Sequence, residues 1–199
     1  MIDRATLPFV FEHPLVTERL VLRLMTLGDV DDVFAYSSLE EVCRYQLHEP
    51  RTRDEVAEQI ANHSAAATLA KDGDYLQLAL ELPATADEPA RVIGDSYFSL
   101  GSVENSRGVI GWTMHPDFMG RGYATEAAST VLDTAFRTLR LHRVMAELDP
   151  RNTASIALCK RLGMREEAYF VQDLAFKGEW GDTGVYAILR DEWVAAHPQ

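Results

Sequence analysis

Apolar and polar residues alternate in several stretches of the chain, and this period-two pattern is typical of β-strands with one buried face. Clusters of glycine, proline, asparagine and aspartate separate the stretches and predict turns between them. The expected strands are residues 19–25, 75–82, 91–103, 109–114, 143–148, 164–176 and 184–189. Residues 1–16 are expected to form an extended lead-in, and residues 177–182 a turn-rich loop.

Elsewhere the apolar residues recur every three or four positions, which is the spacing of one face of an α-helix. This spacing predicts helices at residues 29–38, 52–71, 123–139 and 152–162. Thr52 and Glu55 have the spacing of a capping box, and Gly163 is a typical stop signal. Residues 39–50 fit neither pattern. Strands that follow one another in the middle, with helices crossing over at both ends, indicate one α/β (α+β) domain over residues 1–199 with a mixed sheet.

The composition narrows the classes of function. The net charge of −12 argues against a nucleic-acid partner and would favour a cationic substrate, although it is also an ordinary solubility charge. No apolar run approaches the ~20 residues that cross a bilayer, so no membrane partner is expected. The two cysteines, Cys43 and Cys159, are not in a C-x-x-C motif, and we expect free thiols in a cytoplasmic protein.

A glycine turn, Gly120-Arg121-Gly122, lies between a predicted strand and the longest predicted helix. Glycine allows a ligand to approach the backbone, and the free N–H groups of a helix start attract phosphate. A mononucleotide P-loop is excluded because Tyr123 and Ala124 follow instead of Lys and Ser or Thr. A dinucleotide turn is disfavoured so late in the chain, and a purely structural turn is a further alternative. A third interpretation, a cradle for the pyrophosphate of coenzyme A, is the one that a family resemblance implies.

Around this turn the sequence resembles a known family. Gly111-Trp112 and the run from His115 to Ala127 look like the central acyl-CoA motif of the GNAT N-acetyltransferases, closest to the RimJ/RimL-like branch. Residues 17–23 resemble the opening strand of that branch. Residues 152–155 and 160–164 resemble its second CoA-side helix. The similarity covers residues 15–190 in the right order, and Asp117 departs from the first position of the glycine motif.

The resemblance implies a GNAT fold, with a mixed, mostly antiparallel sheet of about seven strands flanked by about four helices. It implies direct transfer of an acetyl group from acetyl-CoA to a primary amine such as a protein N-terminus. A small cationic amine (an aminoglycoside or polyamine), another acyl donor such as succinyl-CoA, and a non-catalytic CoA-binding module are alternatives. The resemblance also allows a homodimer. No cluster has metal-ligand spacing, so no metal is expected.

The resemblance also implies a set of residues that bind the cofactor. The backbone around the glycine turn would hold the pyrophosphate, the backbone N–H of Met114 would polarise the thioester carbonyl, and Asn152 would contact the pantetheine arm. The full set is Trp112, Thr113, Met114, Met119, Gly120, Arg121, Gly122, Tyr123, Ala124, Thr125, Asn152 and Ser155. Asn152 is equally expected to cap its helix.

The catalytic assignments are less specific. Ser155 is the expected proton donor to the departing thiolate, whereas Cys159, one helical turn later, is expected to be packing. The candidates for a general base, acting directly or through water, are Asp95, Glu104, His115, Glu147 and Asp149. The acceptor should bind between the first two helices and the 177–182 loop. Tyr45, Trp180 and Tyr186 are candidates to line that site.

Overall fold

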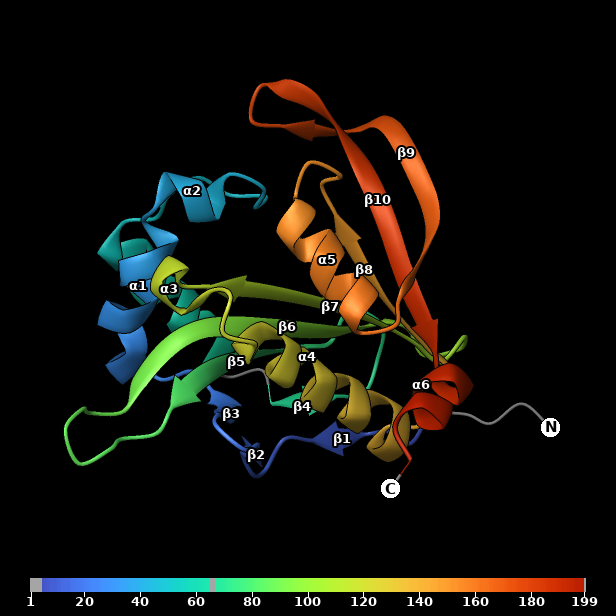
Figure 1. Ribbon diagram of the computed structural model, residues 1–199, viewed down its shortest axis with the longest axis horizontal. Helices are drawn as coiled ribbons and strands as arrows, with labels where there is room; N and C mark the ends of the chain where they lie inside the picture. Colours follow the sequence, from blue (N-terminus) through green and yellow to red (C-terminus); the bar gives the residue numbers. More distant parts are fainter. Residues whose placement is uncertain (1–4, 65–66, 199) are drawn as a thin grey trace.

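The computed structural model describes residues 5–64 and 67–198. Its main element is an eight-stranded sheet in which seven neighbouring pairs of strands include one parallel pair, β7 with β8. In sheet order the strands are β2 (Leu15–Val16), β3 (Val21–Leu24), β5 (Tyr75–Leu82), β6 (Arg91–Ser102), β7 (Arg107–Met114), β8 (Arg143–Leu148), β10 (Glu179–Leu189) and β9 (Arg165–Phe176). A separate pair joins β1 (Phe9–Val10) to β4 (Thr68–Leu69). Figure 1 shows the twisted sheet and the β9–β10 hairpin extending beyond it.

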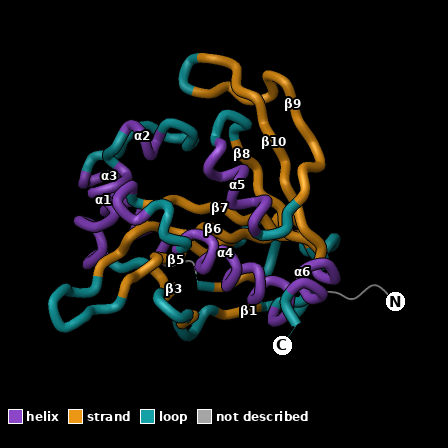
Figure 2. The backbone as a smooth tube through the Cα atoms, in the orientation of Figure 1, coloured by secondary structure: helices purple, strands orange, loops and turns teal. Residues whose placement is uncertain are grey.

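Helices cover both faces of the sheet (Figure 2). They are α1 (Val30–Ser37), α2 (Glu40–Cys43), α3 (Arg53–Ser64), α4 (Tyr123–Asp133), α5 (Thr153–Arg161) and α6 (Arg190–Ala196). The predicted class, a mixed and mostly antiparallel sheet with flanking helices, is therefore confirmed.

The alternation of side chains along β5 explains why two helical layers are needed. Leu78 and Leu80 join the cluster that packs under α4, while Ala79 joins a second cluster formed with α1 and α3. Successive residues of a strand point to opposite faces, so a strand with apolar residues on both faces must be covered twice. Cys43 and Cys159 are both buried as free thiols, as expected.

Several predicted boundaries were wrong. The helix expected to reach residue 71 ends at Ser64, and Thr68–Leu69 is a strand instead; residues 65 and 66 lie outside the described residues. The loop expected at 177–182 is a tight turn at Lys177 and Gly178, after which β10 begins at Glu179. The helix expected at 123–139 is α-helical to Asp133 and π-helical over Thr134–Thr138. The sequence interpretation missed helix α6. The expected extended lead-in, residues 1–16, contains β1 and β2, and its residues 1–4 lie outside the described residues.

One charged cluster fixes the start of α1 to the sheet. Arg23 on β3 donates to both oxygens of Asp29, at 2.7 and 2.8 Å, and to Glu81 on β5, at 2.7 Å. Asp29 is only 6% exposed. Burial raises the pKa of Asp29, but the bonds from Arg23 and from the Thr26 amide outweigh it and hold the pKa below its usual value. The carboxylate depends on these donors because an unpaired buried charge is costly.

Replacing Arg23 with alanine should therefore lower the free energy of unfolding by about 3 kcal/mol, because two carboxylates lose their cation. Urea denaturation at pH 7 measures this. Arg53→Ala is the matched control: it removes an arginine whose ion pair with Asp31 is exposed on both sides, and it should cause no measurable loss. Equal losses in the two variants would contradict this account of the Arg23 cluster.

Candidate active site

The glycine turn is an exposed loop that leads directly into α4. Gly120 and Gly122 have φ angles of +73° and +85°, which favour glycine, and Gly122 is the N-cap of α4. A Cβ atom at Gly120 would meet nothing within 4 Å, so the space over this backbone is open. The first N–H groups of α4 have no carbonyl partner within the helix. The turn therefore has the shape and the donors of an anion cradle.

Arg19, which precedes β3, connects the glycine turn to the N-terminal segment by hydrogen bonds. Its guanidinium donates to the Arg121 carbonyl oxygen at 2.9 Å and to Glu126, in the first turn of α4, at 2.7 Å. Glu126 also accepts bonds from the Thr17 hydroxyl and the Arg19 amide. Burial raises the pKa of Glu126, but these donors outweigh it and lower the pKa. Glu126 is thus tied to the N-terminal segment, in addition to its favourable place on the helix dipole.

Strands β7 and β8 separate beside this turn. They pair over three residues each, ending at Val109 and Met145, although β7 continues to Met114. The bond from the His115 amide to the Ile93 carbonyl, at 2.9 Å, leaves Met114 opposite Gly94 without exchanging bonds with it. The N–H and C=O of Met114 therefore point away from β6, toward the side on which β8 has diverged. This is the orientation expected of the Met114 amide.

Trp112 and Ser155 meet across the separated strands. The indole N–H of Trp112 donates to the Ser155 hydroxyl oxygen at 3.2 Å, which connects β7 to α5. The Asn152 side chain accepts a bond from the Ser155 amide at 3.0 Å and is the N-cap of α5, so the predicted capping role is confirmed. Cys159 is fully buried, and burial raises its pKa to about 12, so the thiol is packing, as expected.

A cavity of about 590 Å³ lies beside the separated strands, and both Trp112 and Thr113, whose side chains point to opposite faces of the sheet, line it. Its walls come from α1, the segment after α2, α3, the strands β5 to β8, and the β9–β10 hairpin. The first two predicted helices and the hairpin thus enclose the expected acceptor region. Tyr45 lines this cavity as expected, whereas Trp180 and Tyr186 do not: Trp180 is 64% exposed, and Tyr186 is buried with its hydroxyl donating to Glu166.

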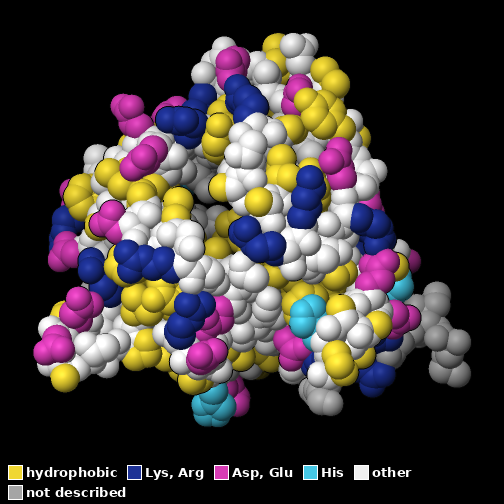
Figure 3. All heavy atoms as spheres, viewed as in Figure 1, with side chains coloured by type: hydrophobic (Ala, Val, Ile, Leu, Met, Phe, Trp, Pro, Cys, Tyr) yellow, Lys and Arg dark blue, Asp and Glu magenta, His cyan; other side chains and the backbone are white. Residues whose placement is uncertain are grey.

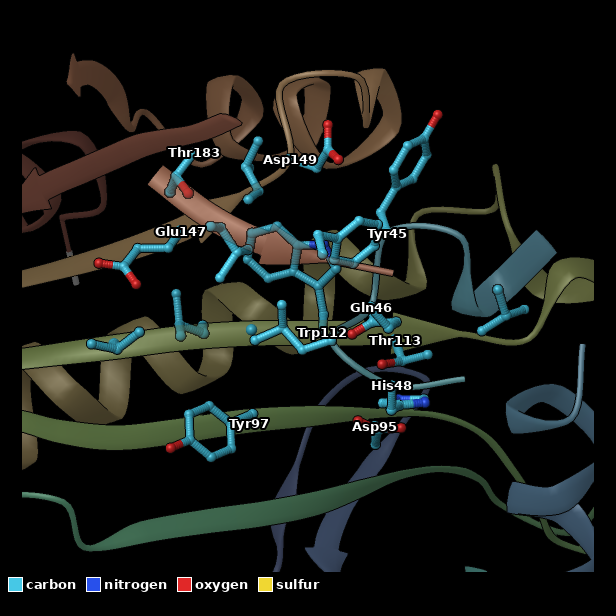
Figure 4. Close-up of a pocket in the computed structure, with 18 of the residues that line it drawn as sticks. Tyr45, Gln46, His48, Asp95, Tyr97, Trp112, Thr113, Glu147, Asp149 and Thr183 are labelled. Carbon is cyan, nitrogen blue, oxygen red and sulfur yellow. The ribbon is translucent and has the colours of Figure 1, made fainter. Parts of the chain in front are cut away.

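Asp95 lies in this cavity, next to the point where the strands separate. It pairs across β6 and β7 with Thr113, and Figure 4 shows both side chains apart from Glu147 on β8. The Tyr36 hydroxyl and the Gln77 amide donate to the two oxygens of Asp95, at 2.7 and 2.6 Å. Burial raises the pKa of Asp95 to about 6, although the bond from Tyr36 and the charge of Arg51 oppose the rise. A carboxyl group with such a pKa can exchange protons near neutral pH.

The other candidates for the general base lie in different surroundings from Asp95. Glu104 is exposed in the turn between β6 and β7 and does not line the cavity, so its position does not suit a general base. The ring of His115 accepts a bond from the Asp117 amide and packs against Phe118, which is a structural role. Asp149 and Glu147 both line the cavity.

Of these two, Asp149 has a cationic partner in the described part of the chain: Arg151 donates to both of its oxygens. Burial raises the pKa of Asp149, but the bonds from Arg151 outweigh it and keep the carboxylate ionised. Glu147 is an exposed carboxylate on the opposite wall of the cavity from Asp95 (Figure 4).

Figure 3 shows a hollow near the centre of the α4–α5 face, with Lys and Arg side chains as well as Asp and Glu side chains on the surface around it. Arg121, in the glycine turn, has its guanidinium over the Phe118 ring at 5.5 Å.

Comparison with known proteins decides what this arrangement is. Residues 19–165 match the family model described as the acetyltransferase (GNAT) domain. The chain belongs to the GNAT acetyltransferase family. It is 31% identical to an uncharacterised N-acetyltransferase of Bacillus subtilis, YnaD, over 90% of this chain and 98% of that protein. A GNAT-family acetyltransferase structure from Bacillus anthracis superimposes with a TM-score of 0.78 at 28% identity, over 90% of this chain and 99% of that one.

Two relatives with named acceptors match less of this GNAT enzyme. The Escherichia coli [ribosomal protein uS5]-alanine N-acetyltransferase is 31% identical over 42% of this chain and 43% of its own length. The E. coli spermidine N(1)-acetyltransferase is 26% identical over 41% of this chain and 44% of its own. The chain is thus an acyl-CoA-dependent N-acetyltransferase by family. No helix among the described residues is long and apolar enough to cross a membrane.

The contacts of Asp95 predict how the pKa of its carboxyl group responds to a substitution. Replacing Tyr36 with phenylalanine removes a donor to the carboxylate, so the pKa of Asp95 should rise further above about 6. Carboxyl ¹³C NMR measures the titration, and Asp95→Asn assigns the signal. Tyr186→Phe removes a hydroxyl from another buried tyrosine, outside the cavity, and should leave the Asp95 titration unchanged. Titration of Asp95 near its ordinary value in the unmodified protein would refute the assignment.

Proposed function

We propose that this GNAT enzyme transfers an acetyl group from acetyl-CoA to a primary amine that enters the 590 Å³ cavity. The observation that carries the proposal is the meeting of two sites across β7. Trp112, bonded to α5, and Thr113, paired with Asp95, are consecutive residues whose side chains point to opposite faces. A donor held on one face and an amine held on the other would therefore meet where β7 and β8 separate.

The cofactor side would be held mainly by backbone. The turn from Met119 to Thr125 would bind the pyrophosphate, and Gly120 fits this role because its Cβ position is open. Trp112, Thr113 and Met114 would line the path of the pantetheine arm, with Asn152 near it on α5. The Met114 amide would donate to the thioester carbonyl oxygen and stabilise its developing negative charge.

Two side chains would move the protons. The amine nitrogen forms a bond to the acetyl carbon while the carbon–sulfur bond breaks, and the proton lost by the amine passes to Asp95, directly or through water. Ser155 would give its hydroxyl proton to the departing thiolate and regain a proton from solvent, while Asp95 would release the amine proton to solvent. The Ser155 oxygen already accepts the Trp112 N–H, so its own proton is free to be donated elsewhere.

The acceptor could be a protein N-terminus, as in the RimJ/RimL-like branch, or a small amine. The enclosing β9–β10 hairpin favours a small amine or the first residues of an extended peptide, since the cavity is within the size range of small-molecule sites. We infer a cytoplasmic enzyme, in keeping with its two free buried thiols.

Release of free thiol from acetyl-CoA, measured with a panel of amines, tests the proposed function. Gly120→Val should weaken CoA binding about 100-fold, because its side chain would occupy phosphate space and remove charge-assisted bonds. Gly73→Val is the matched control: Gly73 also has a positive φ and open space at its Cβ, but lies in a remote turn, so CoA affinity should be retained. Tight CoA binding without thiol release from any amine would indicate a non-catalytic module. Failure to bind CoA would refute the proposal.

The role of Asp95 predicts a pH profile. Asp95 is a carboxylate only above its pKa of about 6, so kcat/KM for the amine should rise as the pH increases through 6. Asp95→Asn should lower kcat/KM by about 100-fold and abolish this acid limb. Glu147→Gln, which neutralises an exposed carboxylate on the opposite wall, should keep the limb. An unchanged limb in Asp95→Asn would show that another group accepts the proton.

A further inference from the structure

The end of the cavity beneath α1 and α3 contains an unusual group of polar side chains, here called the inner subsite: Ser37 on α1, Arg51 before α3 and Gln59 on α3. All three line the cavity, as do Gln77 and Asp95 on the neighbouring strands. Ser37, Arg51 and Gln59 have no part in the acetyl transfer described above, and each of these three has side-chain polar atoms without a partner among the described residues.

Arg51 is a partly buried arginine whose guanidinium has no hydrogen-bond or ion-pair partner among the described residues. Its backbone is fixed, because its amide donates to the Ser37 carbonyl oxygen at 3.0 Å. The neighbouring Arg53, by contrast, has a side-chain partner: its guanidinium donates to Asp31 at 2.8 Å. An arginine at such a site presents a planar set of donors that suits a carboxylate. Its charge reaches Asp95, whose pKa it lowers.

Two neighbouring groups add to this set of donors. The Ser37 hydroxyl and the Gln59 side-chain oxygen are buried without a hydrogen-bond partner in the described part of the chain, and Ser37 is only 3% exposed. Buried polar groups are nearly always paired, so two unpaired ones at residues that line one cavity are unusual. The Ser37 hydroxyl can rotate and donate, and the Gln59 amide can turn its NH₂ group toward a ligand. Together with Arg51, these residues place three groups able to donate at this end of the cavity.

The inner subsite lies at a defined position relative to the reaction point. Thr113 on β7 is beside the separated strands, Asp95 is on the next strand, β6, and Gln77 is on β5 below α3. The subsite residues share the cavity with Asp95, and Arg51 is near enough to Asp95 for its charge to lower the pKa of that carboxyl group. A ligand that reaches from the reaction point to the subsite therefore needs only a short linker, such as that of an extended dipeptide, at about 3.3–3.6 Å per residue, or of an ω-amino acid.

We propose that the acceptor is a small zwitterionic amine, in which a primary amino group is joined by a short linker to a carboxylate that binds Arg51, Ser37 and Gln59. The proposal rests on the acetyltransferase function proposed above. It selects amino acids with a distant amino group and short peptides over polyamines, which have no anionic group. An α-carboxylate and an acidic side chain share the chemistry that the subsite recognises.

Acidic residues also line the cavity, namely Glu147, Asp149, Asp173 and Asp182. Asp149 is paired with the Arg151 cation, and Asp182 accepts bonds from two neutral donors, the Tyr169 hydroxyl and the Gln172 amide. A carboxylate ligand is therefore expected at the Arg51 end of the cavity and not beside these residues. Burial lowers the pKa of His48, which lines the cavity near Asp95, so this ring is neutral at pH 7 and Arg51 supplies fixed positive charge at this end.

Matched pairs of amines test the proposal. Thiol release from acetyl-CoA is measured with dipeptides and ω-amino acids, each beside its C-terminal amide, and with spermidine and an amidated N-terminal peptide. Calorimetry of the CoA-loaded enzyme measures binding of the same amines. In the best pair the free carboxylate should give a kcat/KM about tenfold or more above that of its amide, because only the carboxylate forms charge-assisted bonds. Arg51→Gln should remove this preference by weakening the carboxylate member alone.

Arg53→Gln is the matched control, since it removes the same charge two residues away, outside the cavity, and should leave the preference intact. The proposal would be overturned if the amide had the same kcat/KM as its carboxylate in every pair. It would also be overturned if spermidine or the amidated peptide were the best acceptor. Either result would leave the acetyltransferase function standing. The proposal would also be overturned if no amine with a carboxylate were either acetylated or bound. CoA binding, measured alongside, shows separately whether the proposed function itself holds.

Discussion

The early end of the pairing between β7 and β8 is the constraint on which the rest of the site depends. Two parallel strands that stay paired leave no room between them, and their amides are used by the sheet. Here the pairing stops after three residues, at Val109 and Met145, and β7 continues for five more residues paired with β6 but not with β8. The backbone of Met114 is thereby turned toward open space, and the two faces of the sheet communicate through the gap.

Each face then contributes a different kind of recognition. On the α4 face the proposed ligand groups are mainly backbone amides at a helix start, positioned by a turn that has two glycines with positive φ. Arg19 and Glu126 fasten this turn to the chain before β3, so the cradle depends on residues about 100 positions apart. On the α1 face recognition depends on side chains, with Asp95 near the reaction point and Arg51 farther away.

The environment of Asp95 shows how the fold tunes one of these side chains. Burial disfavours the carboxylate, while Tyr36, Gln77 and the charge of Arg51 favour it. The balance leaves a group that changes its protonation near pH 6, which no exposed aspartate in water does. A cation as close as Arg51 would ordinarily be paired with such a carboxylate. Here Tyr36 and Gln77 occupy the oxygens of Asp95 instead, and the guanidinium remains available to the cavity.

The sequence by itself determined the elements and the cradle, because both are encoded by residues close together in the chain. Alternation predicted 75–82 and 143–148 with the bounds of β5 and β8, and the glycine turn, Asn152 and Ser155 were found because strand, turn and helix are consecutive. Only the tertiary structure decided which carboxylate lies beside the separated strands and is the base that we propose. Asp95 and Glu104 looked equivalent, but the fold buries the first beside Thr113 and exposes the second in a distant turn. Ser37, Arg51 and Gln59 come together only when α1 and α3 pack on β5, and long-range contacts of this kind leave no local pattern to read.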